Sequence, residues 1–337
     1  MEIKKSVVTR KDVALAAGVS ETIVSYVINN TRYVAPEKRK RVLEAIEQLH
    51  YKPNTIARAL RGKGSSHILF VAGNLSNEYY GSLVEAIDSV AYDAGFLISL
   101  MGYQNTPDFV SRILTRQVDA VIISSIAMSV DSIRKLAEAG LAVVLLMSRD
   151  YPDLQCENVS HIYTGIESGI MRAVRLMYDK GRRNLVHVDR ISRNGHFSNR
   201  QDLRYRGFCN QMEAYGLPLH KSSFITGCTN YEELFDAVKA RIRSGIPVDG
   251  FVCRNDLLAC TVVNAVQSCG LNVPKDISVT GFDDSRMSRV IQPQLTTLAH
   301  DQAGIAAAIL ETIKHMLNGG MAEDHYFQTT LIERSTT

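Results

Sequence analysis

The sequence predicts a small all-α module followed by an α/β body that contains two lobes of parallel sheet. Residues 1–64 carry 13 Lys and Arg against 6 Asp and Glu, whereas the remaining chain carries 25 against 29. The first segment has the periodicity of short amphipathic helices, and the chain after residues 64–66 (GSS) alternates apolar runs with amphipathic helices. About 270 residues is long for a single such sheet, which favours two lobes.

Length and composition exclude several classes of protein. The 337 residues contain 45% apolar and 22% charged side chains, which is typical of a globular chain and excludes a disordered one. The start of the sequence has no apolar leader, and no apolar run approaches the ~18 residues of a transmembrane helix. We therefore expect a cytoplasmic protein with no membrane partner.

Cysteine and histidine spacing argues against a metal site. The six cysteines include no C-x-x-C pair, which indicates reduced thiols rather than a zinc site or a set of disulfides. The nine histidines include no pair three or four residues apart, and no nucleotide-binding or hydrolase motif is present. We expect no cofactor, no metal and no enzymatic activity.

The basic module contains a helix, a glycine turn and a second capped helix. Thr9 is the predicted N-cap of a helix that covers residues 12–17. Gly18 supplies the left-handed backbone of a tight turn, and Ser20 caps a second helix over residues 21–28. This order is that of the helix-turn-helix, which places its second helix in the major groove of DNA.

A third helix and one face of the second helix complete the predicted DNA-binding surface. Pro36 begins a helix that ends at residue 49 and carries four consecutive basic residues. In the second helix the apolar side chains share one face and the polar side chains share the other. We expect DNA contacts from Thr9, Lys11, Ser20, Glu21, Thr22, Ser25, Tyr26, Asn29 and Tyr33.

The body alternates predicted strands with predicted helices. Most of these strands are near-continuous apolar runs, as parallel strands buried on both faces require. The predicted strands are 67–72, 96–101, 119–125, 142–147, 184–189, 249–253 and 277–282. The predicted helices are 78–94, 108–116, 129–139, 166–179, 231–243 and 255–269. This alternation is typical of doubly wound α/β layers.

The segment after the third helix, residues 51–62 (YKPNTIARALRG), completes a resemblance to a known family. Residues 9–62 resemble the headpiece and hinge of LacI/GalR bacterial transcription regulators. Within them, residues 24–35 (VSYVINNTRYVA) and 50–51 (HY) are most similar to the purine-repressor branch. In that family a hinge helix folds on operator DNA, and a leucine wedges into the minor groove. The resemblance gives these roles to Asn54, Ala57 and Leu60.

The resemblance extends into the body. Residues 74–80 (NLSNEYY), 203–208 (LRYRGF) and 281–284 (GFDD) resemble the corresponding segments of the family. They imply a periplasmic-binding-protein-like body with two lobes, three crossover strands and a small effector in the cleft. An alternative for Arg204 and Asp283 is a purely structural ion pair. We expect effector contacts from Tyr79, Tyr80, Ser124, Arg204, Asn255 and Asp283.

Several cleft positions depart from the family pattern. Met147 stands where the family usually has Asp, Gly165–Ile166 replace two polar groups, and Thr229 replaces an aromatic residue. His300 stands where Gln is usual. A site for a neutral hexose needs several convergent hydrogen-bonding side chains. We therefore expect an effector with one anionic or strongly polar end and a flatter remainder that stacks on Tyr79.

The resemblance also implies domain boundaries and an assembly. The predicted boundaries are a helix-turn-helix headpiece over 1–53, a hinge helix and linker over 54–64, and the body over 65–337. Within the body we expect a first lobe of 65–163 and 296–322 and a second lobe of 164–295 and 323–337. Residues 331–337 (LIERSTT) resemble the last body strand of the family, and no apolar heptads follow them, so we expect a twofold homodimer that binds a palindromic operator.

These features imply a sequence-specific transcription regulator, a repressor, controlled by a small molecule. Tyr26 stands where many family members carry Arg, so the sequence does not say which operator base this position reads. The effector is unidentified, and carbohydrate-derived compounds are among the candidates. One alternative is the same DNA-binding role under the control of a partner protein. A weaker alternative is a sugar-binding receptor, against which the missing signal peptide argues.

Overall fold

A computed structural model describes residues 8–51, 64–73, 75, 77–154 and 156–337 of the chain. It divides into two compact units, Met1–Ser65 and Ser66–Thr337. The predicted hinge residues Asn54, Ala57 and Leu60 lie outside the described residues.

The first unit contains three short helices around one small core. Its helices are α1 (Arg10–Ala17), α2 (Glu21–Asn29) and α3 (Pro36–Gln48), close to the predicted ranges. The apolar side chains of α2 point inward, as their spacing predicts. The buried residues of this core are Val13, Ala14, Ala17, Val24, Val27, Val42, Ala45 and Tyr51.

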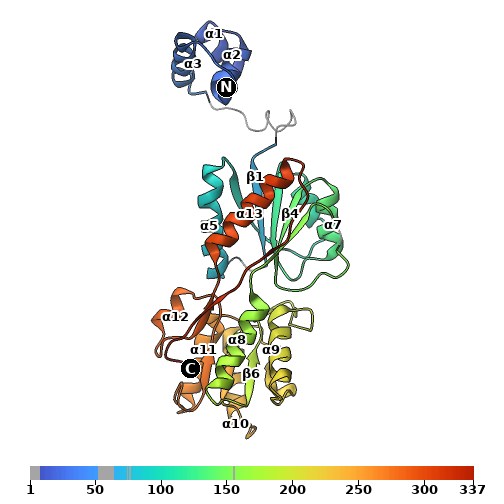
Figure 1. Cartoon of the computed structure of the whole chain (residues 1–337), viewed down its shortest axis with the longest axis vertical. Coiled ribbons are helices and arrows are strands. Elements are labelled where there is room, and N and C mark those ends of the chain that lie inside the picture. Colours follow the sequence, from blue (N-terminus) through green and yellow to red (C-terminus); the bar gives the residue numbers. More distant parts are fainter. Residues whose placement is uncertain (1–7, 52–63, 74, 76, 155) are drawn as a thin grey trace, which may run out of the picture. The chain divides into compact units, whose positions relative to one another are not determined.

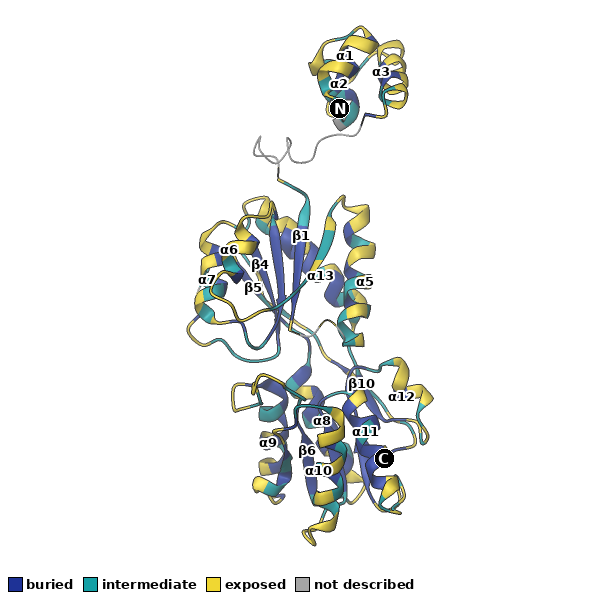
Figure 2. Cartoon of the chain, turned by 180° about the vertical axis from the view of Figure 1, so that it is seen from behind, coloured by how far each residue is buried: buried dark blue, intermediate teal, exposed yellow. Residues whose placement is uncertain are grey.

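The first lobe of the second unit is a six-stranded sheet in the order β11-β5-β4-β3-β1-β2, and every pair is parallel (Figure 1). Its strands are β1 (His67–Ala72), β2 (Leu97–Gly102), β3 (Ala120–Ser124), β4 (Ala142–Met147), β5 (Val159–Tyr163) and β11 (His325–Tyr326). The central strands β1, β3 and β4 are almost wholly buried and dark blue in Figure 2, whereas the edge strands β2 and β11 contain no buried residue and the outer faces of the helices are exposed.

Helices cover both faces of this sheet because successive side chains of a strand point to opposite sides. Ile68 and Phe70 pack with α5 (Glu78–Asp93) and α13 (Gln302–Leu317) on one face. Leu69 and Val71 belong to the core on the other face. The helices α6 (Phe109–Leu114) and α7 (Val130–Glu138) contribute to that second core.

The second lobe is a four-stranded parallel sheet in the order β7-β6-β8-β9. Its strands are β6 (Leu185–Val188), β7 (Phe224–Ile225), β8 (Gly250–Cys253) and β9 (Ser278–Thr280). One face packs against α8 (Ile166–Asp179) and α9 (Leu203–Ala214), and the other against α10 (Tyr231–Arg243) and α11 (Asp256–Ser268). A short helix, α12 (Arg286–Val290), follows β9, and a 3₁₀ turn, η1 (Lys221–Ser223), precedes β7.

The chain passes between the lobes three times, as the family resemblance implies (Figure 1). The first crossing joins β5 to α8, and the second runs through β10 (Thr297–Ala299) to α13. The third leads from β11 to β12 (Thr330–Ile332), which pairs antiparallel with β10. Among the described residues, no helix is long and apolar enough to cross a membrane.

One predicted lobe boundary is wrong. The second lobe was expected to resume at residue 323, but β11 still belongs to the sheet of the first lobe. Tyr326 pairs in register with Tyr163, and the amide of Phe327 donates to the carbonyl of Tyr163 at 2.7 Å. A two-residue edge strand has too little pattern to be recognised without its partner.

Candidate functional site

The start of α1 is fixed by a capping box. The hydroxyl of Thr9 accepts from the amide of Asp12 at 3.4 Å and donates to its carboxylate at 2.7 Å. The amide of Thr9 donates to the same carboxylate at 2.8 Å. The predicted N-cap is therefore confirmed, and the hydroxyl of Thr9 is engaged within the headpiece.

The turn before α2 places that helix with its polar face outward. Gly18 has φ +60°, the left-handed backbone predicted for the turn. Ser20 caps α2 by accepting from the amide of Ile23 at 3.4 Å, which leaves its hydroxyl hydrogen free for another acceptor. Glu21 and Thr22 are exposed. The second helix can therefore present side chains to a partner while its apolar face stays in the core.

Tyr26 lies on the same helix and is half-buried beside a basic residue. The guanidinium carbon of Arg32 lies 5.4 Å from the centre of the Tyr26 ring, within cation–π range. Ser25 is also half-buried, Lys11 is exposed, and Tyr33 is 88% exposed with no core contact to hold its ring. The structure does not describe the side chain of Asn29. Apart from Asn29, the predicted DNA-contacting residues on α2 and beside it are therefore exposed or half-buried.

Three of the predicted effector residues lie in a group that we call the interlobe cluster: Tyr79, Arg204, Phe282, Asp283 and His300. Arg204, on α9, and Asp283, in the loop after β9, are both buried. Nη2 of Arg204 lies 3.6 Å from Oδ1 of Asp283, and Nε2 of His300 lies 3.5 Å from the same oxygen. A guanidinium nitrogen and an imidazole nitrogen therefore face the same carboxylate oxygen.

Aromatic and guanidinium planes connect the lobes through this cluster. The ring of Tyr79, on α5 of the first lobe, lies 4.6 Å from the ring of His300 on the second crossing. The ring of His300 lies 5.2 Å from that of Phe282, and the guanidinium of Arg204 lies 4.7 Å above Phe282. The face of Tyr79 that was expected to stack on an effector therefore contacts His300 in this structure.

Hydrogen-bonding capacity remains open in the cluster. Nε of Arg204, Oδ1 of Asp283 and Nε2 of His300 are buried and make no hydrogen bond to any described residue. Burial and the charge of Asp283 raise the pKa of Tyr79 well above its usual value, so its hydroxyl stays neutral. Unpaired buried polar atoms are costly, and a polar ligand or water would satisfy them.

The other three predicted effector residues, Tyr80, Ser124 and Asn255, contact neighbouring parts of the fold. The Tyr80 ring packs 5.4 Å from Tyr79 and 6.2 Å from Phe70. Ser124 is buried at the carboxyl end of β3, where its carbonyl accepts from an amide at 3.0 Å. Asn255 caps α11 by accepting from the amide of Leu258 at 3.0 Å. A capping role therefore explains Asn255 without a ligand.

A buried ionic network lies beside the interlobe cluster and was not predicted from the sequence. Nη1 of Arg254 donates to Asp202 at 3.0 Å, and Arg190 donates to the same carboxylate. Asp189 accepts from the amide and hydroxyl of Ser198 at 2.8 Å and 2.5 Å. Burial would raise the pKa of Asp202, but Arg254 and Arg190 hold it well below its usual value. The network is therefore charged and paired.

A sequence signal for this network was available. Asp189 directly follows β6 and Arg254 directly follows β8, so both lie at the carboxyl ends of parallel strands. That edge of an α/β sheet is where ligands bind. Burial and the neighbouring charge of Arg254 lower the pKa of Arg190 to about 10, so the guanidinium group of Arg190 remains charged near neutrality.

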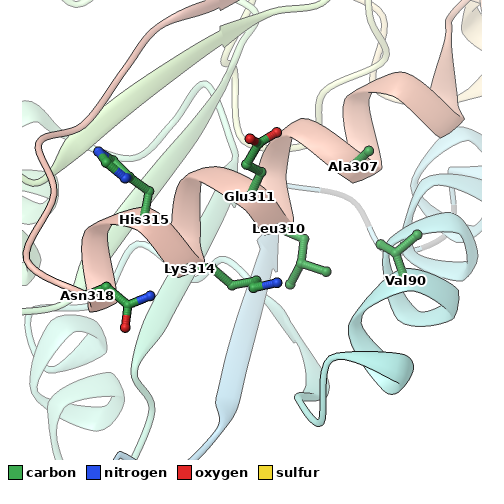
Figure 3. A pocket seen from close by; sticks show the side chains of 7 residues that line it. All are labelled: Val90, Ala307, Leu310, Glu311, Lys314, His315 and Asn318. Atoms are coloured by element: carbon green, nitrogen blue, oxygen red, sulfur yellow. The ribbon is translucent and has the colours of Figure 1, made fainter.

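Two shallow grooves lie outside the predicted effector set. One, of about 470 Å³, lies between α5 and α13 and contains Val90 from α5 (Figure 3). Its other lining residues come from α13 and its C-cap: Ala307, Leu310, Glu311, Lys314, His315 and Asn318. The other groove, of about 440 Å³, lies on α10 and α11. Within the described ranges, no three His, Cys, Asp or Glu side chains are arranged to hold a metal ion.

Family models match both parts of the chain. Residues 9–54 match the bacterial regulatory proteins of the lacI family, and residues 174–337 match a periplasmic binding protein-like domain. The chain belongs to the lacI family of bacterial regulatory proteins. As a lacI-family protein it is a DNA-binding transcriptional repressor controlled by effector binding, and not an enzyme.

Curated relatives in the lacI family cover nearly the whole chain. Catabolite control protein A of Priestia megaterium is 28% identical over 315 residues, which are 92% of this chain and 93% of the relative. The HTH-type transcriptional repressor PurR of Histophilus somni (strain 129Pt) is 28% identical over 310 residues, with 90% and 91% covered. The predicted family is therefore confirmed.

Solved structures confirm the predicted fold class. The Lac repressor dimer bound to operator and the anti-inducer ONPF is 23% identical, with a TM-score of 0.83 and coverage of 98% of this chain and 99% of that one. The complex of the transcriptional regulator CelR with cellobiose is 21% identical, with a TM-score of 0.70 and coverage of 98% and 100%. A helical headpiece followed by a two-lobe α/β body is the fold of this lacI-family chain.

Proposed function

We propose that a homodimer of this chain represses transcription by binding a palindromic operator through its two headpieces. The observation that carries this proposal is the outward polar face of α2, capped by Ser20, within the stretch that matches the lacI family. The relatives include proteins named as HTH-type repressors, and one solved neighbour is a Lac repressor dimer bound to operator. A twofold dimer matches the symmetry of a palindrome.

The DNA-contacting residues of this proposal are those of α2 and its surroundings. Glu21, Thr22, Ser25 and Tyr26 face outward for base contacts, while Lys11 and the basic start of α3 suit phosphates. The family resemblance adds the hinge residues Asn54, Ala57 and Leu60 to the proposed DNA-contacting residues. Because a repressor acts on genes, we propose that the protein works in the cytoplasm.

The proposed effector site is the interlobe cluster. Nε of Arg204 can donate to a ligand, whereas Oδ1 of Asp283 can accept from one. A small polar molecule that carries an acceptor next to a donor satisfies both atoms. A flat remainder would stack on Tyr79 only after displacement of His300, whose ring lies 4.6 Å away. A neutral hexose therefore finds few of the side chains that it needs.

DNA binding is tested by selection of an operator from random duplexes, followed by titration of the full chain against the selected and scrambled duplexes. We expect strong preference for a palindrome and a steep salt dependence, with a slope of about −0.9 per phosphate neutralised. Equal affinity for scrambled DNA, or an affinity insensitive to salt, would refute the proposal.

Effector control is tested by a thermal-shift panel of sugars, sugar phosphates, carboxylates and nucleobases, with operator titrations for each hit. We expect a hit among the polar or anionic compounds, and affinity weaker than millimolar, about −4 kcal/mol at best, for unmodified hexoses. Tight operator binding with no response to any compound would favour control by a partner protein instead.

A further inference from the structure

Arg149 is a cation of the first lobe that has no carboxylate partner. It lies two residues beyond β4, at the carboxyl edge of the first-lobe sheet, where α/β proteins bind ligands. Among the described residues, no Asp or Glu oxygen lies within 4.0 Å of its guanidinium nitrogens. By contrast, the arginines that the second lobe contributes to this region each have such a partner: Arg190, Arg204, Arg206 and Arg254.

The backbone around Arg149 sets the direction of its side chain. Arg149 and Asp202 form an isolated antiparallel bridge, which a 3.0 Å backbone hydrogen bond between the lobes flanks on each side. Side chains that lie directly opposite each other in an antiparallel pair project to the same face. The side chain of Arg149 therefore leaves the first lobe on the side where the second lobe carries Asp202.

Asp202 is already engaged with other donors in spite of this position. One of its oxygens accepts from Nη1 of Arg254 at 3.0 Å and from the amide of Arg204 at 2.9 Å. Its other oxygen accepts from Arg190. Because two guanidinium groups already balance the carboxylate of Asp202, the charge of Arg149 remains for another anion.

The guanidinium of Arg149 is held in place and keeps a free donor. Its Nη2 donates to the carbonyl of Met128 at 3.0 Å, and its central carbon lies 4.5 Å from the centre of the Tyr151 ring. The hydroxyl of Tyr151 donates to the carbonyl of Ser125 at 3.0 Å, which fixes that ring. Nε of Arg149 is buried and makes no hydrogen bond to a described residue. A positioned guanidinium with a free N–H suits the oxygens of a carboxylate or phosphate.

Tyr80 connects the pair of Arg149 and Tyr151 to the interlobe cluster. The ring of Tyr80 lies 5.4 Å from that of Tyr79, which belongs to the cluster. The hydroxyl of Tyr80 lies within electrostatic range of both Tyr151 and Arg204. The free donor of the first lobe and the open atoms of the interlobe cluster are therefore neighbours.

We propose that Arg149 and Tyr151 form an oxyanion site on the first lobe, which binds a carboxylate or phosphate group of the effector. This inference rests on the proposed effector control and adds the place of the anionic end. The anionic end lies at Arg149, and the polar remainder reaches Arg204 and Asp283 in the interlobe cluster. An effector bound in this way contacts both lobes, so it favours the arrangement in which they approach each other.

Inorganic phosphate is the probe that tests this site, titrated into the full chain without DNA at an ionic strength held constant with chloride. Hydrogen exchange at the amides of Asp150 and Leu203 is the readout, because these amides flank Arg149 and make the hydrogen bonds between the lobes. We expect a saturable slowing of exchange in the wild type. Arg149→Gln should bind phosphate about tenfold to hundredfold more weakly, because a charged hydrogen bond is lost. Arg116→Gln, at an exposed position of the same lobe, is the matched control and should behave as the wild type.

A second variant keeps the test decisive if Arg149→Gln does not fold. Arg149→Lys keeps the charge but loses the planar guanidinium, so we expect its affinity for phosphate to lie between those of the wild type and of Arg149→Gln. No saturable slowing in the wild type, or an unchanged affinity for phosphate in the Arg149 variants that fold, would overturn the oxyanion site.

Operator titrations keep a failure of the site apart from a failure of the proposed function. Without effector, we expect equal operator affinity in the wild type and in the variants of Arg149. Phosphate binding through Arg149, combined with an operator affinity that no compound of the thermal-shift panel changes, would support the oxyanion site and contradict effector control.

Discussion

Nη2 of Arg204 lies 3.6 Å from Oδ1 of Asp283, too far for a hydrogen bond although both side chains are buried. A structural ion pair in such a place normally closes, because desolvated charges are compensated only at short range. The open contact, together with the unpaired Nε of Arg204, instead keeps a donor and an acceptor available to a third molecule. This geometry favours the effector-binding interpretation of the pair over the purely structural one.

Replacement of Arg204 tests that interpretation. We expect Arg204→Ala to abolish the response to any effector found in the thermal-shift panel, because a buried charged hydrogen bond is lost. The loss of affinity should be about 2–5 kcal/mol. Calorimetry with the hit compound measures it, and operator titration without effector should be unchanged. Arg200→Ala, at an exposed position just before α9, is the control. An unaltered response in Arg204→Ala would exclude the interlobe cluster as the effector site.

Tyr26 supplies a second prediction, on operator specificity. Its hydroxyl can donate to a base, and its ring packs against Arg32. We expect Tyr26→Ala to cost about 1–3 kcal/mol on the selected operator and to relax preference at one base pair in each half-site. Tyr26→Phe keeps the ring and separates base contact from packing, since only a base contact is lost in that variant. Equal losses on selected and scrambled DNA would contradict a role in specificity.

The strands and helices with a long, clear hydrophobic pattern could be predicted together with their first and last residues. β1, β4, α8 and α10 have the predicted bounds because each is a long apolar run or a clear helical stripe. The short strands β7, β10 and β11 could not be predicted, since each has two or three residues and exists only through its partner, and β12 was expected only from the family resemblance of residues 331–337. α13 also received no prediction, although its buried residues Ile305, Ile309 and Ile313 recur every four residues on one face.

The candidate site likewise contains residues that could be predicted from the sequence and contacts that could not. Arg204 and Asp283 were found through motifs, but His300 contacts Thr164 on the first crossing and Tyr79 on α5, and no local pattern encodes these contacts. The ionic partners Asp202 and Arg254 are 52 residues apart, and only the packing of β8 against the loop before α9 brings them together. Asn255 was also found through a motif, and its side-chain oxygen caps α11, a local role that the sequence pattern did not indicate.

Arg206 is the basis of a third prediction, on the contact between the lobes. Its guanidinium donates to Glu167 at 2.9 Å and pairs with Asp150, which lies in the loop after β4 of the first lobe. Beside it the amide of Asp150 donates to the carbonyl of Gln201 at 3.0 Å, and the amide of Leu203 donates to the carbonyl of Ser148 at 3.0 Å. These bonds join the lobes.

We expect Arg206→Ala to speed hydrogen exchange of the amides at Asp150 and Leu203 about fivefold, corresponding to about 1 kcal/mol for a partly exposed ion-pair network. Arg175→Ala removes an exposed pair with Asp179 on α8 and should leave these amides unchanged. Equal exchange at these amides in the wild type and in Arg206→Ala would show that the backbone pairing holds the lobes without the arginine.

The last prediction concerns stability in acid. His187, on β6, is fully buried, and its Nδ1 lies 3.0 Å from the carbonyl of Val252. Burial lowers the pKa of His187 from 6.5 to about 4, so the unfolded chain binds a proton in this interval that the folded chain excludes. Its contribution to stability is complete above about pH 6.5 and falls as the pH is lowered to about 4, by roughly 3 kcal/mol in total.

His187→Asn keeps a donor near the position of Nδ1 but cannot titrate, so we expect a weaker fall in stability between about pH 6.5 and 4 than in the wild type. Urea unfolding of the full chain at several pH values measures the difference. Comparison with the wild type is essential because Asp256 has the opposite sign: its raised pKa makes stability fall as the pH rises toward about 7. The exposed His315→Asn should follow the wild-type curve. Parallel curves for His187→Asn and the wild type would mean that His187 accepts its proton in the folded state, in spite of its complete burial.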